Sequence, residues 1–190
     1  MPAGRTLGTP AALLALVVAC AGALLALAAA PGVAPAAACA NARAHPGDVS
    51  LAQMRKAITC LVNQERKQRD RRPLKRNRRL KAAAKQHNEV MLATECFRHR
   101  CEGERGLSGR VRASGYTKGR KAWRVAEVLG YENTPRQMIG RWMNSGINRH
   151  RILTSEFRDV GVGVGLGAPV AGQDDSRFAT YTVVFGWRRP

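Results

Sequence analysis

The stretch from residue 142 to residue 165, WMNSGINRHRILTSEFRDVGVGVG, constrains the fold more than any other part of the chain. It starts as the end of an amphipathic helix, and we expect a short polar turn and an Ile-Leu anchor to follow. The valines at positions 160, 162 and 164 then alternate with glycines, which is the two-residue period of a strand. Tyr181, Val183 and Phe185 alternate in the same way and indicate a neighbouring strand, with residues 167–176 as the hairpin loop between them.

Apolar residues at helical spacing fill the earlier part of the chain. Ser50 and Asn77 are placed to cap two helices, and Thr134 with Pro135 to start another, with proline at the first helical position. A short helix is expected over residues 107–113 and a strand around residues 124–129. The expected helices come early in the chain, and the two clearest strands come late and next to each other. This order predicts an α+β fold, in which helices cover an antiparallel sheet. The residues expected to face inward from the three longer helices are Met54, Ile58, Leu61, Val62, Leu80, Ala84, His87, Met91, Met138, Ile139, Trp142 and Met143.

The N-terminus has the three parts of a secretory signal. Arg5 supplies the positive start, residues 11–30 are apolar and uncharged, and residues 36–38 are alanines that suit cleavage. We therefore expect residues 1–38 to be a cleaved signal peptide, followed by a polar lead over 39–49 and one domain over 50–190. The alternative is an uncleaved membrane anchor, because twenty apolar residues just cross a bilayer. Ten alanines make this run weakly hydrophobic, which favours cleavage and a secreted, extracellular protein.

Four cysteines remain after the signal, and an even number in an exported chain suggests disulfide bonds. Three pairings are available. A bridge between Cys96 and Cys101 closes a loop of only four residues and is geometrically easy, and Cys39 would then pair with Cys60. The alternatives are four free thiols, which are uncommon outside the cytoplasm, and a zinc site, for which no Cys-x-x-Cys pair exists.

The chain is strongly basic after the signal. Residues 39–190 carry 31 Lys and Arg against 13 Asp and Glu, a net charge of +18. This charge favours attachment to anionic wall polymers or lipid surfaces, and the alternative is a merely solvated basic face. We do not expect specific nucleic-acid binding, since the chain has no nucleic-acid motif and exported proteins seldom meet nucleic acid. The densest part, interrupted by one acid, is a predicted basic patch of Lys67, Arg69, Arg71, Arg72, Lys75, Arg76, Arg78 and Arg79.

A series of motifs occurs along the chain in a characteristic order. They are Asn63-Gln64-Glu65-Arg66, Pro73-Leu74, Leu80-x-x-Ala83-Ala84-x-x-His87, Cys96-Phe97-Arg98-His99, Trp142-Met143-x-Ser145, Ile152-Leu153 and Phe157-Arg158-Asp159-Val160-Gly161-Val162-Gly163-Val164. In order and spacing they resemble a bacterial CAP/SCP domain, of the superfamily of cysteine-rich secretory proteins, plant pathogenesis-related proteins and venom antigens. The resemblance covers residues 50–187. It implies an α-β-α sandwich with a central, mostly antiparallel sheet and a cleft on one side of that sheet.

In that family the cleft typically collects two histidines and acidic residues, and some members bind a divalent metal there. The resemblance places His99 at the first histidine and Glu127 at an acid. Asn148 stands at the second histidine position, and His150 follows two residues later. We expect His99, Glu127 and His150 as candidate ligands of a zinc-like ion, with His150 recruited by repacking of the turn. His87, on an apolar helix face, is expected to be a hydrogen-bonded core residue.

Resemblance and charge together predict a secreted, monomeric, disulfide-supported domain that acts as a non-enzymatic binding module at the cell envelope. The first alternative is a hydrolase, such as a peptidase, in which His99 and Glu127 perform acid–base catalysis with or without a metal. No nucleophile stands out, because Ser108, Ser114 and Ser145 lack a Gly-x-Ser-x-Gly context. The simpler interpretation of His99 and Glu127 is a bonded structural pair. The second alternative, a lipid or sterol carrier, rests on the family resemblance alone.

Overall fold

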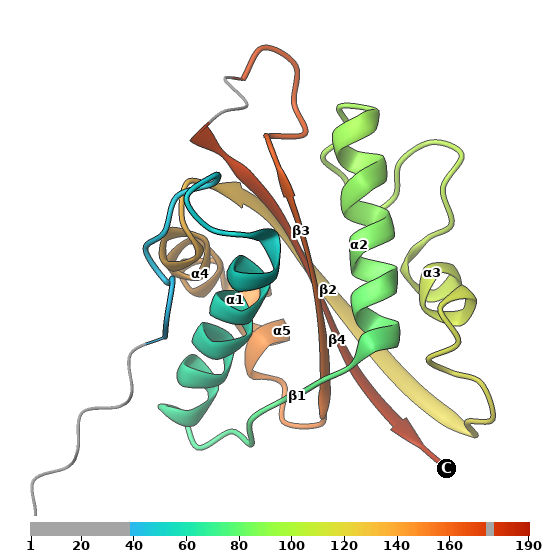
Figure 1. Ribbon diagram of the computed structural model, residues 1–190. Helices are drawn as coiled ribbons and strands as arrows, with labels where there is room; N and C mark the ends of the chain where they lie inside the picture. Colours follow the sequence, from blue (N-terminus) through green and yellow to red (C-terminus); the bar gives the residue numbers. More distant parts are fainter. Residues whose placement is uncertain (1–38, 174–176) are drawn as a thin grey trace, which may run out of the picture. The chain divides into compact units, whose positions relative to one another are not determined.

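The computed structural model describes residues 39–173 and 177–190 (Figure 1). The predicted signal peptide lies outside the described residues, as do residues 174–176 of the predicted hairpin loop. In the described part of the chain, no helix is both long and apolar enough to span a membrane. The elements in chain order are α1 (Leu51–Lys67), β1 (Lys75–Arg76), α2 (Arg78–Ala93), α3 (Leu107–Ala113), β2 (Ala122–Glu132), α4 (Pro135–Asn144), α5 (Gly146–Leu153), β3 (Asp159–Leu166) and β4 (Ala179–Arg189).

The described strands form a four-stranded sheet in the order β1-β3-β4-β2. β4 pairs antiparallel with both β3 and β2, whereas β1 runs parallel to β3 over only two residues. One face of the sheet packs against α1, α4 and α5, and the other packs against α2 and α3 (Figure 1). This arrangement confirms the predicted α-β-α sandwich with a mostly antiparallel sheet.

The alternation of valine and glycine in β3 sets the spacing of the two helix layers. Val160, Val162 and Val164 join the large apolar core under α1 and α4. The intervening glycines face α2 at very close range. A Cβ added to Gly161 would lie 2.1 Å from the main chain of Leu80, and one added to Gly163 would lie 2.5 Å from the carbonyl oxygen of Ala84. The helix main chain therefore rests directly on the strand, which is tolerated only because no side chain intervenes.

The predicted helix starts and the predicted core are confirmed. Ser50 accepts the N–H of Gln53, Asn77 accepts those of Arg79 and Leu80, and Thr134 accepts that of Gln137. Each of these bonds satisfies a donor that the first helical turn leaves free. The short helix spans the predicted residues 107–113. All twelve residues expected to face inward from the longer helices are buried.

The polar turn expected after Trp142 is wrong, because residues 146–153 form helix α5. Ser145 adopts extended backbone angles that end α4, and its hydroxyl then accepts the N–H of Asn148, which starts the second helix. The buried guanidinium of Arg66 on α1 fixes the end of α5 by donating to the carbonyls of Ile152 at 2.6 Å and Thr154 at 2.9 Å. A polar, amphipathic segment of eight residues is therefore held helical by capping and by tertiary contacts.

Two strands also differ from the sequence prediction. β2 extends to residues 122–132, beyond the predicted 124–129, because it pairs with β4 along its whole length. β1 has no counterpart in the prediction. Its two residues, Lys75 and Arg76, are exposed and count as a strand only through their pairing with Asp159 and Val160.

The disulfide pairing that the sequence favoured is present. Cys39 pairs with Cys60, which ties the N-terminal lead to α1, and Cys96 pairs with Cys101. The Cα atoms of the two pairs lie 5.7 and 6.0 Å apart, within the usual range for a disulfide. The second bridge closes the loop that follows α2, and this loop carries His99. One disulfide therefore restrains a residue of the predicted cleft.

The contact between α2 and β3 predicts a large difference between two glycine substitutions. Gly161→Ala should lower the free energy of unfolding by about 1–3 kcal/mol, because the new methyl group meets the α2 main chain. Gly140→Ala is the control, since its Cβ would meet nothing within 4 Å on α4; it should be neutral or raise stability by roughly 0.5–1 kcal/mol. Urea denaturation measures both. Equal stability of the two variants would contradict the close packing.

Candidate functional site

A cluster of charged side chains lies under α2, on the face of the sheet opposite the large core. The alternation of β2 sends Val128 into that core and Glu127 to the α2 side. Glu127 is only 2% exposed. Its Oε2 accepts from the guanidinium of Arg110 on α3 at 2.6 Å, and its Oε1 accepts from Nδ1 of His99 at 3.0 Å. A buried carboxylate needs such partners, because an unpaired buried charge is costly.

His87 lies in the same cluster and is fully buried. Its Nδ1 is 2.8 Å from Oε2 of Glu104. The same oxygen lies 3.5 Å from a guanidinium nitrogen of Arg110. Its Nε2 has no hydrogen-bond partner and lies 3.8 Å from Oε1 of Glu127. His87 is therefore a hydrogen-bonded core residue, as its helical position indicates, and it sits between two carboxylates on the inner side of α2.

His99 and Glu127, the two candidate cleft residues, are brought together. The His99 side chain is 54% exposed and sits in the disulfide-closed loop. Nδ1 donates to the Glu127 carboxylate, so in the neutral imidazole Nε2 carries the lone pair. That nitrogen faces an N–H of Arg151 at 3.4 Å, and Arg151 also donates to the Glu127 carbonyl at 2.9 Å.

His150, the third candidate, points elsewhere. It lies next to Arg151 on α5, and successive residues of a helix are rotated by about 100°. His150 therefore lines a different hollow, shared with Arg71, Arg124 and Glu156. The structure brings His99 and Glu127 together and does not bring His150 to them.

Glu104, Arg110 and Arg151 complete the cluster, and sequence reasoning missed all three. For Arg151 a signal was present. Asn148 stands at the family's second histidine position, and Arg151 lies three residues later, so the two side chains share one face of a helix. Glu104 and Arg110 had no comparable signal, since they come from a loop and a short helix whose positions depend on the tertiary fold.

The residues present do not fit the divalent metal that the family resemblance implies. In the described residues, no three His, Cys, Asp or Glu side chains are grouped so that they could hold a metal ion. Both oxygens of Glu127 already accept hydrogen bonds from Arg110 and His99, and Nε2 of His99 faces Arg151. Two guanidinium groups thus stand where a cation would have to bind, and like charges at such distances repel.

The same contacts limit what His99 can do as a base. Its free nitrogen faces Arg151, so proton uptake from a substrate would require this arginine to move. Two of the three serines noted in the sequence serve helix ends instead of His99. The hydroxyl of Ser114 donates to the Val111 carbonyl at 2.8 Å, and that of Ser145 caps α5. The geometry therefore supports a structural ion cluster better than a nucleophilic site.

Arg151 and Asn148 give a direct test of this interpretation. Zinc should leave the melting temperature of the untagged wild-type protein unchanged. The double variant Asn148→His/Arg151→Ala removes the guanidinium and restores the family's histidine, so it should gain saturable zinc binding. At a zinc concentration 100 times its Kd, the linked stabilisation would be about 2.7 kcal/mol. His150→Ala is the control and should behave as wild type. Zinc binding by wild type that His99→Ala abolishes would refute the interpretation.

The fold is similar to solved structures of three bacterial proteins. An outer surface protein of Borrelia burgdorferi matches with a TM-score of 0.60 and 16% identity, over 74% of this chain and 97% of that one. An extracellular protein containing a SCP domain from Bacillus anthracis matches with a TM-score of 0.54 and 21% identity, over 74% and 44%. A cysteine-rich secretory protein of Staphylococcus aureus matches with a TM-score of 0.50 and 20% identity, over 74% and 40%. The chain thus spans less than half the length of the last two proteins, and at these identities the likeness concerns the fold.

Sequence comparison gives the family. No curated protein sequence matches this chain. A family model described as the cysteine-rich secretory protein family, CAP, matches residues 60–185, which is most of the chain. The matched range includes His99, Glu127 and all of α5. The chain therefore belongs to the cysteine-rich secretory protein (CAP) family.

Proposed function

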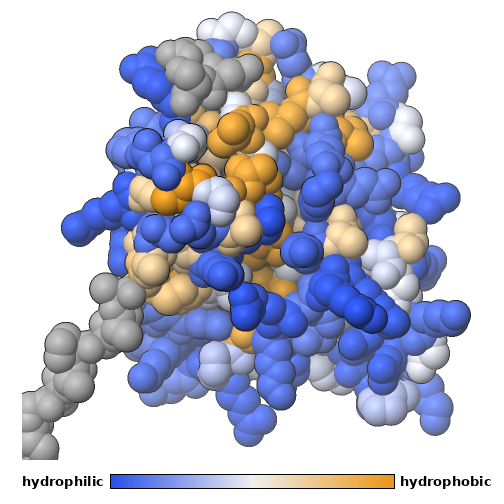
Figure 2. Space-filling model, in the orientation of Figure 1, coloured by the Kyte–Doolittle hydropathy of each residue, from blue (hydrophilic) through white to orange (hydrophobic). Residues whose placement is uncertain are grey.

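We propose that this protein is a secreted, non-enzymatic binding module that attaches to anionic polymers of the cell envelope through a basic face. The observation that carries the proposal is the exposure of the basic patch, which we call the basic face. Seven of its eight cations, all except the half-buried Arg79, are exposed. Figure 2 agrees, since hydrophilic side chains cover the lower part of the molecule, where α1 ends and α2 begins in Figure 1.

The basic face is supported by a fixed backbone. The side chain of Asn63 both donates to and accepts from the main chain of Leu74. The N–H groups of Lys75 and Asn77 donate to the carbonyls of Arg158 and Val160, each at 2.8 Å. The cations of this segment therefore project from an ordered surface. An anionic polymer can bind such a surface without the conformational entropy cost of ordering the protein backbone.

Acids near the basic face neutralise little of its charge. Arg69 pairs with Glu65 on α1 at 2.7 Å, and exposed pairs of this type contribute only about 0–1 kcal/mol. The only acid within the patch is Asp70. A polyanion that meets the remaining cations releases its counterions, and this release drives binding at low salt.

Family and sequence support the extracellular part of the proposal. The family is named for secretory proteins. The N-terminal sequence has the parts of a secretory signal, and the two disulfides suit an oxidising compartment. A binding role is supported further by the cluster around Glu127, whose carboxylate and imidazole groups are engaged by arginines instead of being open to a substrate.

Binding of the protein to a soluble glycerol-phosphate polymer tests the proposal. The mature protein, residues 39–190, should bind, and its affinity should fall steeply between low and physiological salt. The face variant is Arg71→Gln/Arg72→Gln/Lys75→Gln. Its plot of log affinity against log salt should be shallower, with a slope less negative than that of wild type by about 2. The control Arg43→Gln/Arg98→Gln/Arg136→Gln removes the same charge from exposed positions elsewhere. Salt-insensitive retention, or equal losses in both variants, would contradict the proposal.

A further inference from the structure

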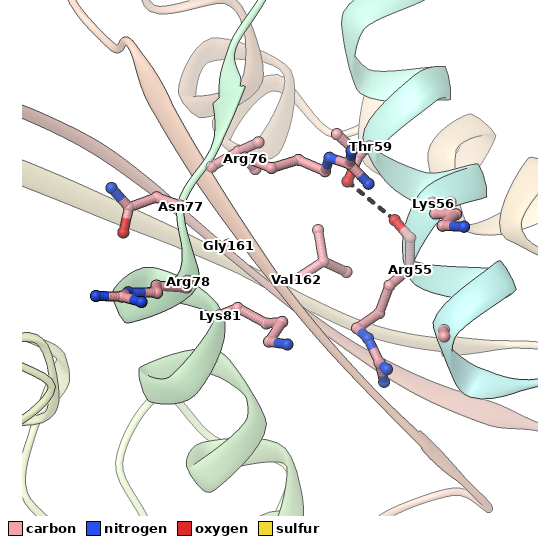
Figure 3. A pocket seen from close by; sticks show the side chains of 11 residues that line it. Arg55, Lys56, Thr59, Arg76, Asn77, Arg78, Lys81, Gly161 and Val162 are labelled. Carbon is pink, nitrogen blue, oxygen red and sulfur yellow. Dashed lines mark hydrogen bonds between the residues drawn. The ribbon is translucent and has the colours of Figure 1, made fainter.

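A groove of about 340 Å³ opens between α1 and the start of α2, above the beginning of β3. Figure 3 shows cationic side chains on both of its sides, with Val162 and Gly161 of β3 between them. The cations come from three elements, so the groove is distinct from the sequence-local basic face, which shares only two of them. The five that line it are Arg55, Lys56, Arg76, Arg78 and Lys81.

The short β1 strand creates this groove. β1 covers β3 only at Asp159 and Val160. Beyond that point no described strand lies next to this edge of β3. The edge instead runs between α1 and α2, which pack on opposite faces of the sheet and so stay apart (Figure 1). The hollow is therefore a consequence of the sheet topology and does not depend on a loop conformation.

The charges around the groove have no partners in the part of the chain that the structure describes. Across residues 39–173 and 177–190, none of the five cations makes a salt bridge or a side-chain hydrogen bond, and no acid lines the groove. Exposed cations elsewhere do find partners where acids are in reach, as Lys85 does with Glu89 and Arg124 with Glu156. Five unpaired positive charges around one hollow repel one another, and an anion between them would relieve that repulsion.

We propose that this groove binds consecutive phosphate groups of a phosphodiester polymer. The inference rests on the proposed function and adds to it one defined site and one ligand chemistry. Three of the five cations are arginines, whose planar fork binds two phosphate oxygens at once. Figure 3 shows the Arg76 side chain extending from β1 towards α1, so cations from the two walls can contact the same anion. Asn77 and Arg78 bring the positive end of α2 to the rim.

The shape and surroundings of the groove favour a soluble polymer over a membrane surface. The site is concave and the cations line its walls, whereas a membrane-binding face projects cations beside apolar anchors. The large apolar side chains exposed in the described part of the chain are Phe97, Ile147 and Leu166, and none of them lines the groove. A narrow, charged strand of phosphates fits the site better than the plane of a bilayer.

Calorimetric titration of the mature protein with inorganic tripolyphosphate tests the site, since this probe carries consecutive phosphates and little else. We expect one saturable site per chain. The groove variant Lys56→Gln/Arg76→Gln/Lys81→Gln should weaken binding at least about tenfold, because it removes three of the five contacts. The face variant defined above removes the same charge outside the groove and should stay within about twofold of wild type. All six substituted residues are exposed, so unchanged melting temperatures serve as the folding control.

The possible results separate the site from the proposed function. Several weak sites, or equal losses in the groove and face variants, would overturn the groove inference even if the glycerol-phosphate polymer is still retained. Tight groove binding of tripolyphosphate without retention of that polymer would support the site and overturn the proposed function. Vesicles containing phosphatidylglycerol form the last arm: if the groove variant loses vesicle binding but keeps polymer binding, the assignment to a polymer is wrong.

Discussion

The main chain of α2 lies directly on Gly161 and Gly163 of β3, so closely that one methyl group would collide with it. This contact fixes the height and direction of the helix, because the packed interface leaves no space for it to shift. α2 in turn carries His87 over Glu127 and places Lys81 at the rim of the groove. The buried ion cluster and the cationic groove thus depend on the same glycine-lined surface, although they share no residue.

Arginine has two roles in this chain that composition alone does not distinguish. Arg66 and Arg110 are buried and hold carbonyls or carboxylates. Burial, together with the nearby charges of Arg158 and Arg71, lowers the pKa of Arg66 to about 10, yet it remains charged at neutral pH and ties α1 to α5. The arginines of the groove have no such partners. The net charge of +18 therefore overstates the charge available to a ligand, and what matters is which cations the fold leaves unpaired.

The sequence predicted the elements whose signals are local. A few neighbouring residues are enough to identify the helix caps at Ser50, Asn77 and Thr134 and the valine–glycine strand. Helix α5 and β1 were not predicted because each depends on a distant partner. The partner of α5 is the guanidinium of Arg66, and that of β1 is the edge of β3. The groove escaped for the same reason: the sequence shows a run of cations from Lys67 onward, but only the tertiary fold adds Arg55 and Lys56 from the preceding helix.

In the cleft, the effect of Asn148 on metal binding depends on the presence of Arg151. The absence of a histidine at position 148 would alone leave a weakened metal site. Arg151, three residues later, donates to the main-chain carbonyl of Glu127 and faces Nε2 of His99, so it places a positive charge beside that site. With the imidazoles neutral, Glu104 and Glu127 balance Arg110 and Arg151, so the cluster carries no net charge. A divalent ion could enter only by expelling a guanidinium from a bonded position, which costs its hydrogen bonds and leaves excess charge. Binding at this cleft is thereby disfavoured, and the unpaired cations between α1 and α2 become the part of the fold with charge left to offer.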